Sequence, residues 1–298
     1  MRVRAVLLAT ILPLACTAAL EAASVQSELQ SGHFRTSDGV ELHYLEAGSG
    51  PALVFVPGFT MPAEIWEPQL RHFAATHRVV ALDPRSQGRS EKVTEGHYLS
   101  RRGLDIGELI EHLGAAPAVV VGWSLGVLEV LTYAHEFGTD ALRAAVLVDM
   151  FIGQDLEPGE PHPLLTPWPS PLQLDREAFT REWVRSMYLS EQPDEYFDAV
   201  AVAVLATPTN TAVVLLVNLV DEAMSPGDYR PALDGLDRPV LFVASSDEWA
   251  VAQAEMVRER RPDARVEVFD DAGHALFVDR ADRFNRVLAE FLASLPDE

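Results

Sequence analysis

Short runs of valine, leucine and alanine alternate with amphipathic stretches along most of the chain, and this alternation restricts its fold more than any other feature. Unbroken apolar runs of this length are typical of parallel strands that are buried on both faces. Parallel strands need crossover connections, and the stretches between the runs have the periodicity of helices. We therefore predict an α/β fold with a mostly parallel, eight-stranded sheet covered by helices.

The predicted elements can be placed by residue number. Strands are expected at 33–36, 40–46, 52–56, 78–82, 118–122, 144–148, 240–244 and 265–269. The first two should form an antiparallel hairpin, because the Ser-Asp-Gly sequence at 37–39 favours a tight turn. Helices of the main body are expected at 66–75, 101–113, 125–137, 251–260 and 280–295.

Residues 151–237 interrupt this rhythm. The stretch 156–174 is dense in proline, so we predict a connecting loop that is neither helix nor central strand. Helical patterns follow at 176–188, 194–206 and 209–224. We predict a core made of residues 24–150 and 238–298, with 151–237 inserted as a helical cap.

The first 23 residues have the layout of a secretory signal peptide, with two early arginines, a short apolar run and then small residues. The apolar run is too short to span a membrane. Cleavage would follow Ala18 or Ala19, or Cys16 would be acylated as the new N-terminus of a lipoprotein. We expect a secreted or periplasmic protein, the alternative being an apolar tail on a cytosolic one.

Charge and cysteine content exclude several functions. The formal net charge is −22, so the surface repels phosphate and we expect no nucleic-acid partner. Cys16 is the single cysteine, so a mature chain that lacks the signal peptide has no disulfide and no thiol nucleophile. The sequence leaves the oligomeric state open.

The sequence Gly-Trp-Ser-Leu-Gly at 122–126 joins a predicted buried strand to a predicted helix. It matches the G-x-S-x-G nucleophile elbow, in which glycines make room for a strained turn that presents the serine. Ser124 is the predicted nucleophile, and the N–H of Leu125 at the start of the helix would stabilise an oxyanion. The alternative is an ordinary turn between a strand and a helix.

A serine hydroxyl needs a base to take its proton. His274 follows the last predicted strand, and Asp247 follows the strand before it. The chain order Ser124, Asp247, His274 is the order of α/β-hydrolase triads, and all three lie at carboxyl ends of strands. Asp149 ends another strand and is the alternative acid, although we favour Asp247.

A second oxyanion donor is expected from the loop after the strand at 52–56. The sequence Val-Pro-Gly-Phe there places the N–H of Phe59 directly after Gly58. The alternative is that Pro57-Gly58 forms only a turn.

These residues resemble the α/β-hydrolase superfamily over about residues 32–295. The similar stretches are "PGF" at 57–59, "DPRSQGRS" at 83–90, "GWSLG" at 122–126 and "DAGHALFVDRADRFNRVLAEFL" at 271–292. Within the superfamily the chain is most similar to serine esterases and to the cofactor-free haloperoxidase or perhydrolase group. Pro57 and Ser86 depart from the family, which commonly has histidine and glycine there.

The resemblance implies a serine hydrolase of small carboxylic esters that works through an acyl-enzyme intermediate, with no metal and no organic cofactor. A lactone, thioester or C–C bond, or a perhydrolase or haloperoxidase-like reaction, would use the same residues. A catalytically silent ligand-binding member of the fold is the alternative from another class.

The cap sequence predicts where substrate selectivity resides. Phe179, Trp183 and Met187 share one helical face, which either packs on the body or roofs an apolar acyl pocket above Ser124. We favour the roof and assign Trp183 and Met187, together with Trp123, to substrate binding. Such a pocket favours uncharged acyl groups; a preference for a succinate ester would instead make the cap arginines the specificity residues.

Overall fold

The fold is described from a computed structural model, which covers residues 28–155, 169–221 and 228–296. One eight-stranded sheet has the order β1-β2-β4-β3-β5-β6-β7-β8. The first two strands form an antiparallel hairpin, β2 pairs antiparallel with β4, and the remaining neighbours are parallel. The predicted mostly parallel, eight-stranded sheet is confirmed.

The strand bounds agree closely with the predicted ones. The strands are β1 (Gln30–Arg35), β2 (Glu41–Ala47), β3 (Ala52–Val56), β4 (Arg78–Leu82), β5 (Ala118–Trp123), β6 (Leu142–Val148), β7 (Val240–Ala244) and β8 (Arg265–Val268). Every residue of β3, β5 and β7 is buried, as expected for strands with helices on both faces.

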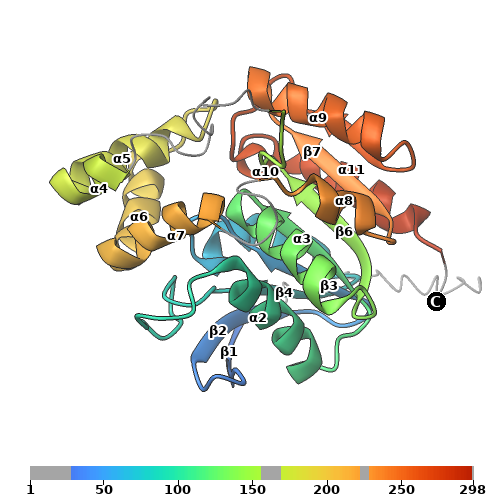
Figure 1. The fold of residues 1–298 in the computed structure, drawn as a ribbon, viewed down its shortest axis with the longest axis horizontal. Coiled ribbons are helices and arrows are strands. Elements are labelled where there is room, and N and C mark those ends of the chain that lie inside the picture. The colour runs from blue at the N-terminus through green and yellow to red at the C-terminus, as the bar shows by residue number, and fades with distance from the viewer. Residues whose placement is uncertain (1–27, 156–168, 222–227, 297–298) are drawn as a thin grey trace, which may run out of the picture.

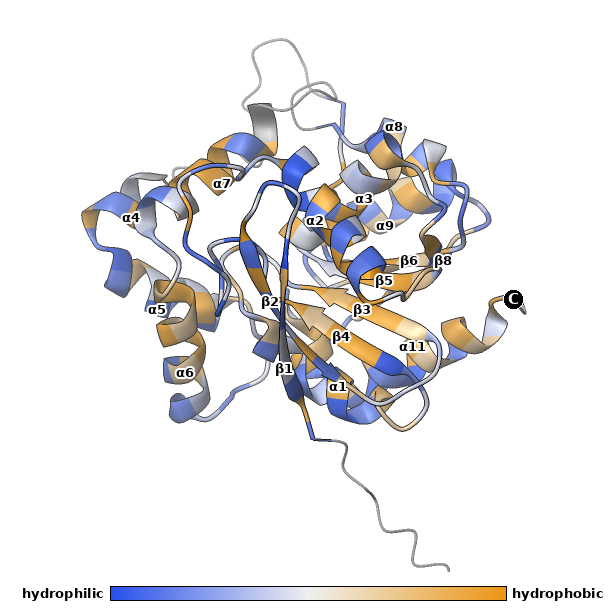
Figure 2. Cartoon of the chain, turned by 90° about the horizontal axis from the view of Figure 1, so that it is seen from below, coloured by the Kyte–Doolittle hydropathy of each residue, from blue (hydrophilic) through white to orange (hydrophobic). Residues whose placement is uncertain are grey.

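Helices cover the sheet in two layers (Figure 2). One layer holds α2 (Leu99–His112), α3 (Leu125–Phe137), α8 (Arg230–Gly235) and α9 (Glu248–Arg260). The other holds η1 (Ala63–Trp66), α1 (Glu67–Phe73), α10 (Leu276–Asp279) and α11 (Ala281–Ser294). Alternate residues of each central strand enter two separate apolar clusters, one under each helical layer.

Four helices between β6 and α8 form a group beside the sheet, which we refer to as the cap (Figure 1). They are α4 (Pro169–Leu174), α5 (Arg176–Ser186), α6 (Asp194–Leu205) and α7 (Thr209–Asp221). Ion pairs Arg181–Asp198 and Arg185–Asp194 show that α5 and α6 run antiparallel.

Helix α4 corrects one prediction, because it lies inside the proline-rich stretch expected to be a loop. Its prolines, Pro169 and Pro171, occupy its first turn, where the missing N–H groups would have no helical partner. The next residue of the helix, Leu172, has a completely buried side chain.

In the described part of the chain, no single helix has the length and apolar character needed to cross a membrane. Helices α6 and α7 pass that test only as a pair bent by 84°, on length and composition alone. The signal-peptide prediction concerns residues outside the described ones.

Candidate active site

Ser124 lies between β5 and α3 in a strained backbone conformation, with φ 53° and ψ −125°. The flanking glycines are required sterically. A Cβ on Gly122 would lie 2.5 Å from the carbonyl oxygen of Gly126, and one on Gly126 would lie 2.6 Å from that of Val56. The sharp turn leaves the serine side chain partly exposed at the carboxyl end of the sheet.

His274 pairs with Asp149 in the structure, and not with Asp247 as we favoured. Its Nδ1 lies 2.7 Å from Oδ2 of Asp149, whose side chain is completely buried. The other carboxylate oxygen of Asp149 accepts a hydrogen bond from the backbone N–H of Ser245 at 2.5 Å. The carboxylate is therefore held from both sides and orients the imidazole.

The positions of the two acids explain this correction. Asp149 directly follows β6, the strand beside the nucleophile strand, and its positive φ of 51° turns the chain sharply there. Asp247 lies three residues beyond the end of β7, where it is exposed and serves as the residue before α9. Its backbone oxygen accepts the N–H groups of Ala250 and Val251, which begin that helix.

Strand register brings Ser124 and Asp149 together. Trp123 pairs with Val148 across β5 and β6, so the next residues of the two strands are neighbours. The N–H of Ser124 donates to the carbonyl oxygen of Val148 at 2.9 Å. The structure records no hydrogen bond from Ser124 Oγ to His274, and such bonds often tighten only when substrate binds.

Trp123 supports the backbone at His274. We predicted a contact with substrate, but its side chain is only 1% exposed. Its indole N–H donates to the backbone oxygen of His274 at 2.9 Å, and its ring packs against those of His274 and Phe277. This correction makes Trp123 a residue that positions His274 from beneath.

The predicted oxyanion loop lies directly against the nucleophile. A Cβ on Gly58 would come within 2.9 Å of Ser124 Cβ, so only glycine allows this approach. Leu125 begins α3, where the first N–H groups of a helix have no helical acceptor. Both predicted donors, Phe59 and Leu125, thus belong to segments that border Ser124.

Gln87 holds the oxyanion loop from below, and sequence reasoning missed it. Its side-chain amide donates to the carbonyl oxygens of Gly58 at 3.0 Å and Met61 at 2.8 Å, on either side of Phe59. Its own oxygen accepts from Arg102, whose Nε donates to Glu129 of α3 at 2.6 Å. One buried chain of side chains thus links the oxyanion loop to the helix that follows Ser124.

The ion pair between Arg102 and Glu129 in this chain of polar groups is buried. Arg102 and Glu129 are each 1% exposed. Burial raises the pKa of the Glu129 carboxyl, while the neighbouring Arg102 guanidinium opposes that rise. The "DPRSQGRS" stretch marked Gln87 as part of a family motif, but its partners are distant backbone oxygens that a sequence does not reveal.

Helix α5 reaches the site at two points. The ring of Trp183 packs edge-on against Phe59, with centroids 5.6 Å apart. The backbone oxygen of Met187, just after α5, accepts the N–H of Ala275 beside the histidine. The predicted stripe is only partly correct, because Met187 is buried, Phe179 and Trp183 are half-buried, and the fully buried α5 side chains are Thr180 and Val184.

Within the described ranges, no three His, Cys, Asp or Glu side chains are grouped so that they could hold a metal ion. Asp149 and His274 form an ionisable pair beside Ser124.

Comparisons with known proteins agree with this geometry. The model of the alpha/beta hydrolase family matches residues 53–287. This range includes the elbow, the oxyanion loop and both members of the Asp149–His274 pair. The chain belongs to the alpha/beta hydrolase family.

The chain is similar to proteins that are named as haloperoxidases and esterases. A non-heme chloroperoxidase of Kitasatospora aureofaciens is 26% identical over 86% of this chain and 98% of its own length. A bifunctional esterase/perhydrolase of Acinetobacter calcoaceticus is 35% identical over 39% of this chain and 44% of its own. The solved esterase from Exiguobacterium antarcticum superposes with a TM-score of 0.79 at 20% identity, over 89% of this chain and all of that one.

Proposed function

We propose that this protein is a serine hydrolase of small carboxylic esters, with Ser124, His274 and Asp149 as its triad. The observation that carries the proposal is the pairing of the buried Asp149 with the partly exposed His274, at 2.7 Å, at the strand ends beside the strained Ser124. A carboxylate in this place fixes the imidazole tautomer and stabilises the imidazolium that forms during reaction.

Each residue then has a defined step. Ser124 Oγ attacks the acyl carbon while His274 Nε2 takes its proton, and the N–H groups of Phe59 and Leu125 bind the oxyanion. His274 returns the proton to the leaving alkoxide, which departs as an alcohol and leaves an acyl-serine. Water attacks this ester with His274 again as base, which releases the acid and restores Ser124.

Hydrogen peroxide could replace water in the second half of this cycle. It would attack the acyl-serine to release a peracid, with the same proton transfer through His274. The 35% identity to an esterase/perhydrolase over 120 residues supports this second activity. Peracid formation from an acetate ester and hydrogen peroxide, lost in Ser124→Ala, would test it.

Two measurements on purified protein test the proposal. A fluorophosphonate probe should label the protein at Ser124, and p-nitrophenyl acetate should be hydrolysed. Ser124→Ala should abolish labelling and lower kcat by about 10⁴ to 10⁶, with the thermal unfolding midpoint unchanged. Folded protein that the probe does not label would favour a silent, ligand-binding member of the fold.

We also propose secretion to the periplasm or beyond, on the evidence of the N-terminal sequence alone. The mass of the mature protein after expression in a bacterial host with its full leader would reveal cleavage. Incorporation of labelled palmitate that Cys16→Ser removes would identify the lipoprotein route, and an uncleaved cytosolic chain would contradict both.

A further inference from the structure

Three arginines of α5 have different surroundings. Arg181 donates to Asp198 and Arg185 donates to Asp194, each at 2.7 Å and each at the surface. Arg176 is different. Its Nε and Nη1 are buried and have no hydrogen-bond partner in the described parts of the chain, and Nη2 reaches only the backbone oxygen of Val204, at 3.3 Å.

Two threonine hydroxyls in the cap are also buried without a partner among the described residues. Thr180 lies one turn after Arg176 on the same face of α5, and it is completely buried. Thr207, at 1% exposure, follows α6, and its N–H donates to the same Val204 oxygen that Arg176 reaches. Arg176 and Thr207 therefore meet at the Val204 oxygen near the end of α6, and Thr180 lies one helical turn from Arg176.

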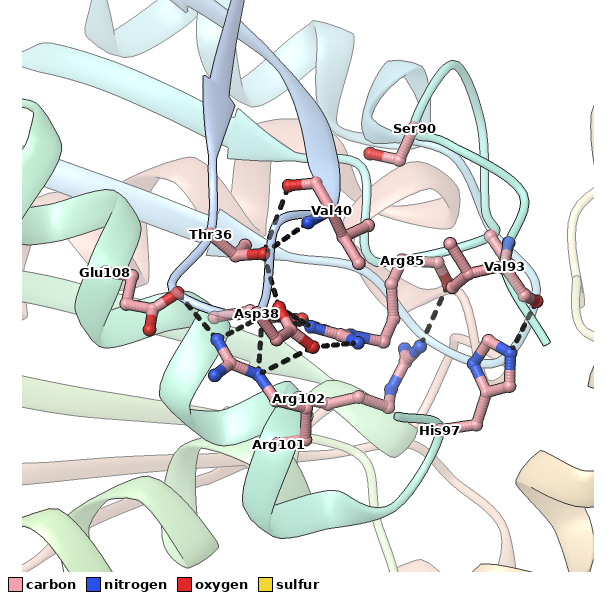
Figure 3. A network of polar contacts seen from close by, with 12 residues as sticks. Thr36, Asp38, Val40, Arg85, Ser90, Val93, His97, Arg101, Arg102 and Glu108 are labelled. Atoms are coloured by element: carbon pink, nitrogen blue, oxygen red, sulfur yellow. Dashed lines mark hydrogen bonds and ion pairs between the residues drawn. The ribbon is translucent and has the colours of Figure 1, made fainter. Parts of the chain in front are cut away.

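This arrangement is costly unless something else completes it. A buried charge without a counter-ion is strongly unfavourable, and native proteins normally pair it. The buried arginines of the main body follow that rule: Arg85 and Arg101 bind Asp105, and Arg102 binds Glu129. Arg85 and Arg101 also lie against Asp38 (Figure 3). The chain has 45 acidic residues, so carboxylates for pairing are plentiful.

The electrostatics of the two kinds of arginine differ in the same way. Hydrogen bonds to Glu177 and Asp198 raise the pKa of Arg181. Burial lowers the pKa of Arg176, and no carboxylate among the described residues opposes this shift. The guanidinium still stays protonated at neutral pH, because arginine remains charged in proteins. Two of its three nitrogens are buried, and the guanidinium has no anionic partner among the described residues.

We propose that Arg176, Thr180 and Thr207 form a binding site for the carboxylate of a small organic acid. The guanidinium supplies several N–H donors in a planar fork that matches a carboxylate, and the two hydroxyls can donate as well. A carboxylate there would supply both the missing negative charge and the missing acceptors.

The position of the site connects it to the proposed ester hydrolysis. Trp183 lies seven residues after Arg176 on the same side of α5, about 10 Å along the helix axis, and its ring contacts Phe59 of the oxyanion loop. The carboxylate could therefore be the far end of an ester bound at Ser124, or a free acid. Only the first source rests on the proposed function.

Binding is tested without turnover in protein that carries Ser124→Ala. Titration calorimetry with sodium hexanoate should detect binding, which Arg176→Met should weaken by about ten- to a hundredfold. Arg181→Met removes the same charge from the same helix at the surface and should change it less than twofold. No binding of hexanoate, or equal weakening by the two variants, would overturn the site.

Two further variants separate binding from folding. Thr180→Val with Thr207→Val keeps the shape of both side chains and should weaken hexanoate binding by about three- to tenfold. Arg176→Lys keeps the charge and should restore part of the affinity lost in Arg176→Met. Normal unfolding midpoints combined with unchanged affinity in these variants would contradict the proposal.

The source of the carboxylate is tested with active enzyme. Mono-p-nitrophenyl suberate and p-nitrophenyl octanoate have acyl chains of equal length and differ in the terminal carboxylate. If Arg176→Met lowers the ratio of their kcat/KM values at least tenfold, the carboxylate belongs to the substrate. If Arg176→Met leaves the ratio of kcat/KM values unchanged but abolishes hexanoate binding, the ligand is a free acid. If the parent protein hydrolyses neither ester, the proposed function is refuted, while the hexanoate titration still tests the site.

Discussion

The main body and the cap differ in how they pair the buried guanidinium nitrogens of arginine. In the main body, Arg85 and Arg102 are each 1% exposed and each donates to a buried carboxylate. In the cap, the buried nitrogens of Arg176 have no such partner among the described residues. A paired network fixes the relative positions of loops and helices, whereas an incomplete one is expected where a ligand completes it.

The two regions also differ in how they use apolar residues. The central strands are buried on both faces between two helical layers. The cap leaves several large apolar side chains exposed: Leu174, Val202, Val214 and Val217. The central strands are thus covered on both faces, whereas the cap leaves part of its apolar surface exposed.

The largest expected effect tests the acid in the main body. Asp149→Asn should lower kcat for p-nitrophenyl acetate by roughly 10⁴, because the amide stabilises the wrong imidazole tautomer. Asp247→Asn removes an exposed carboxylate near the same strand ends and should cost less than about threefold. Steady-state kinetics of the two variants decide between them, and the reverse ranking would return the role to Asp247.

The comparison of arginines predicts opposite effects on stability. Arg102→Met leaves the Glu129 carboxylate buried without its partner and should lower the free energy of unfolding by about 3–5 kcal/mol. Arg176→Met strands no buried carboxylate in the described structure and should change it by less than about 1 kcal/mol, or raise it.

Denaturant and thermal unfolding of both variants, beside the parent protein, measure this difference. Equal destabilisation by the two substitutions would show that Arg176 is paired as firmly as Arg102. The contrast between the regions would then be wrong.

Gln87 should matter for rate more than for substrate affinity. Gln87→Ala frees the carbonyl oxygens of Gly58 and Met61, so the loop that carries Phe59 loses its support. We expect kcat to fall about ten- to a hundredfold, less than the loss of an oxyanion donor itself, with KM changed less than threefold.

Gln253→Ala is the matched control for this variant. Gln253 is also a buried glutamine bound to backbone, but it holds Ile152 and Gly153, away from the oxyanion loop. Gln253→Ala should lower the free energy of unfolding about as much as Gln87→Ala does, and it should keep most of the kcat of the parent protein. Similar kcat losses in both variants would reduce the role of Gln87 to general stability.

Much of the sheet could be predicted from the sequence for a physical reason. Strands 52–56, 78–82 and 240–244 were predicted to the residue, because burial on both faces demands an unbroken apolar run. Helix 125–137 was also predicted correctly, since the elbow fixes its start and Gly138 its end. The helix expected at 280–295 is α11, at 281–294, and the short α10 before it was not predicted.

The site was predictable only as far as chain order determines it. Both acids follow strands of the sheet, and nothing in the sequence reveals that Asp149 adopts a positive φ and faces His274. The roles of Gln87 and Arg176 depend on which backbone and carboxylate groups surround them in three dimensions. The local sequence pattern predicts where a helix or strand lies, whereas the tertiary structure determines which groups each side chain contacts.

The smallest expected effect concerns the cap as a selector of acyl groups. Trp183 contacts Phe59 of the oxyanion loop, and we predict that its ring also covers the acyl chain of an ester bound at Ser124. A pocket lined in this way should gain up to about 0.8 kcal/mol, or three- to fourfold in kcat/KM, for each methylene that it buries. Trp183→Ala should flatten the rise in kcat/KM from p-nitrophenyl acetate through butyrate to octanoate while leaving the acetate value within about twofold.

Trp249 offers the comparison that decides which region forms this pocket. Its ring lies 6.1 Å from that of His274, and the side chain is 39% exposed, but it belongs to α9 of the main body. If the cap selects the acyl group, Trp249→Ala keeps the dependence on chain length that Trp183→Ala loses. If the outcomes are exchanged, the acyl pocket lies against α9, and the main body would provide selectivity as well as chemistry.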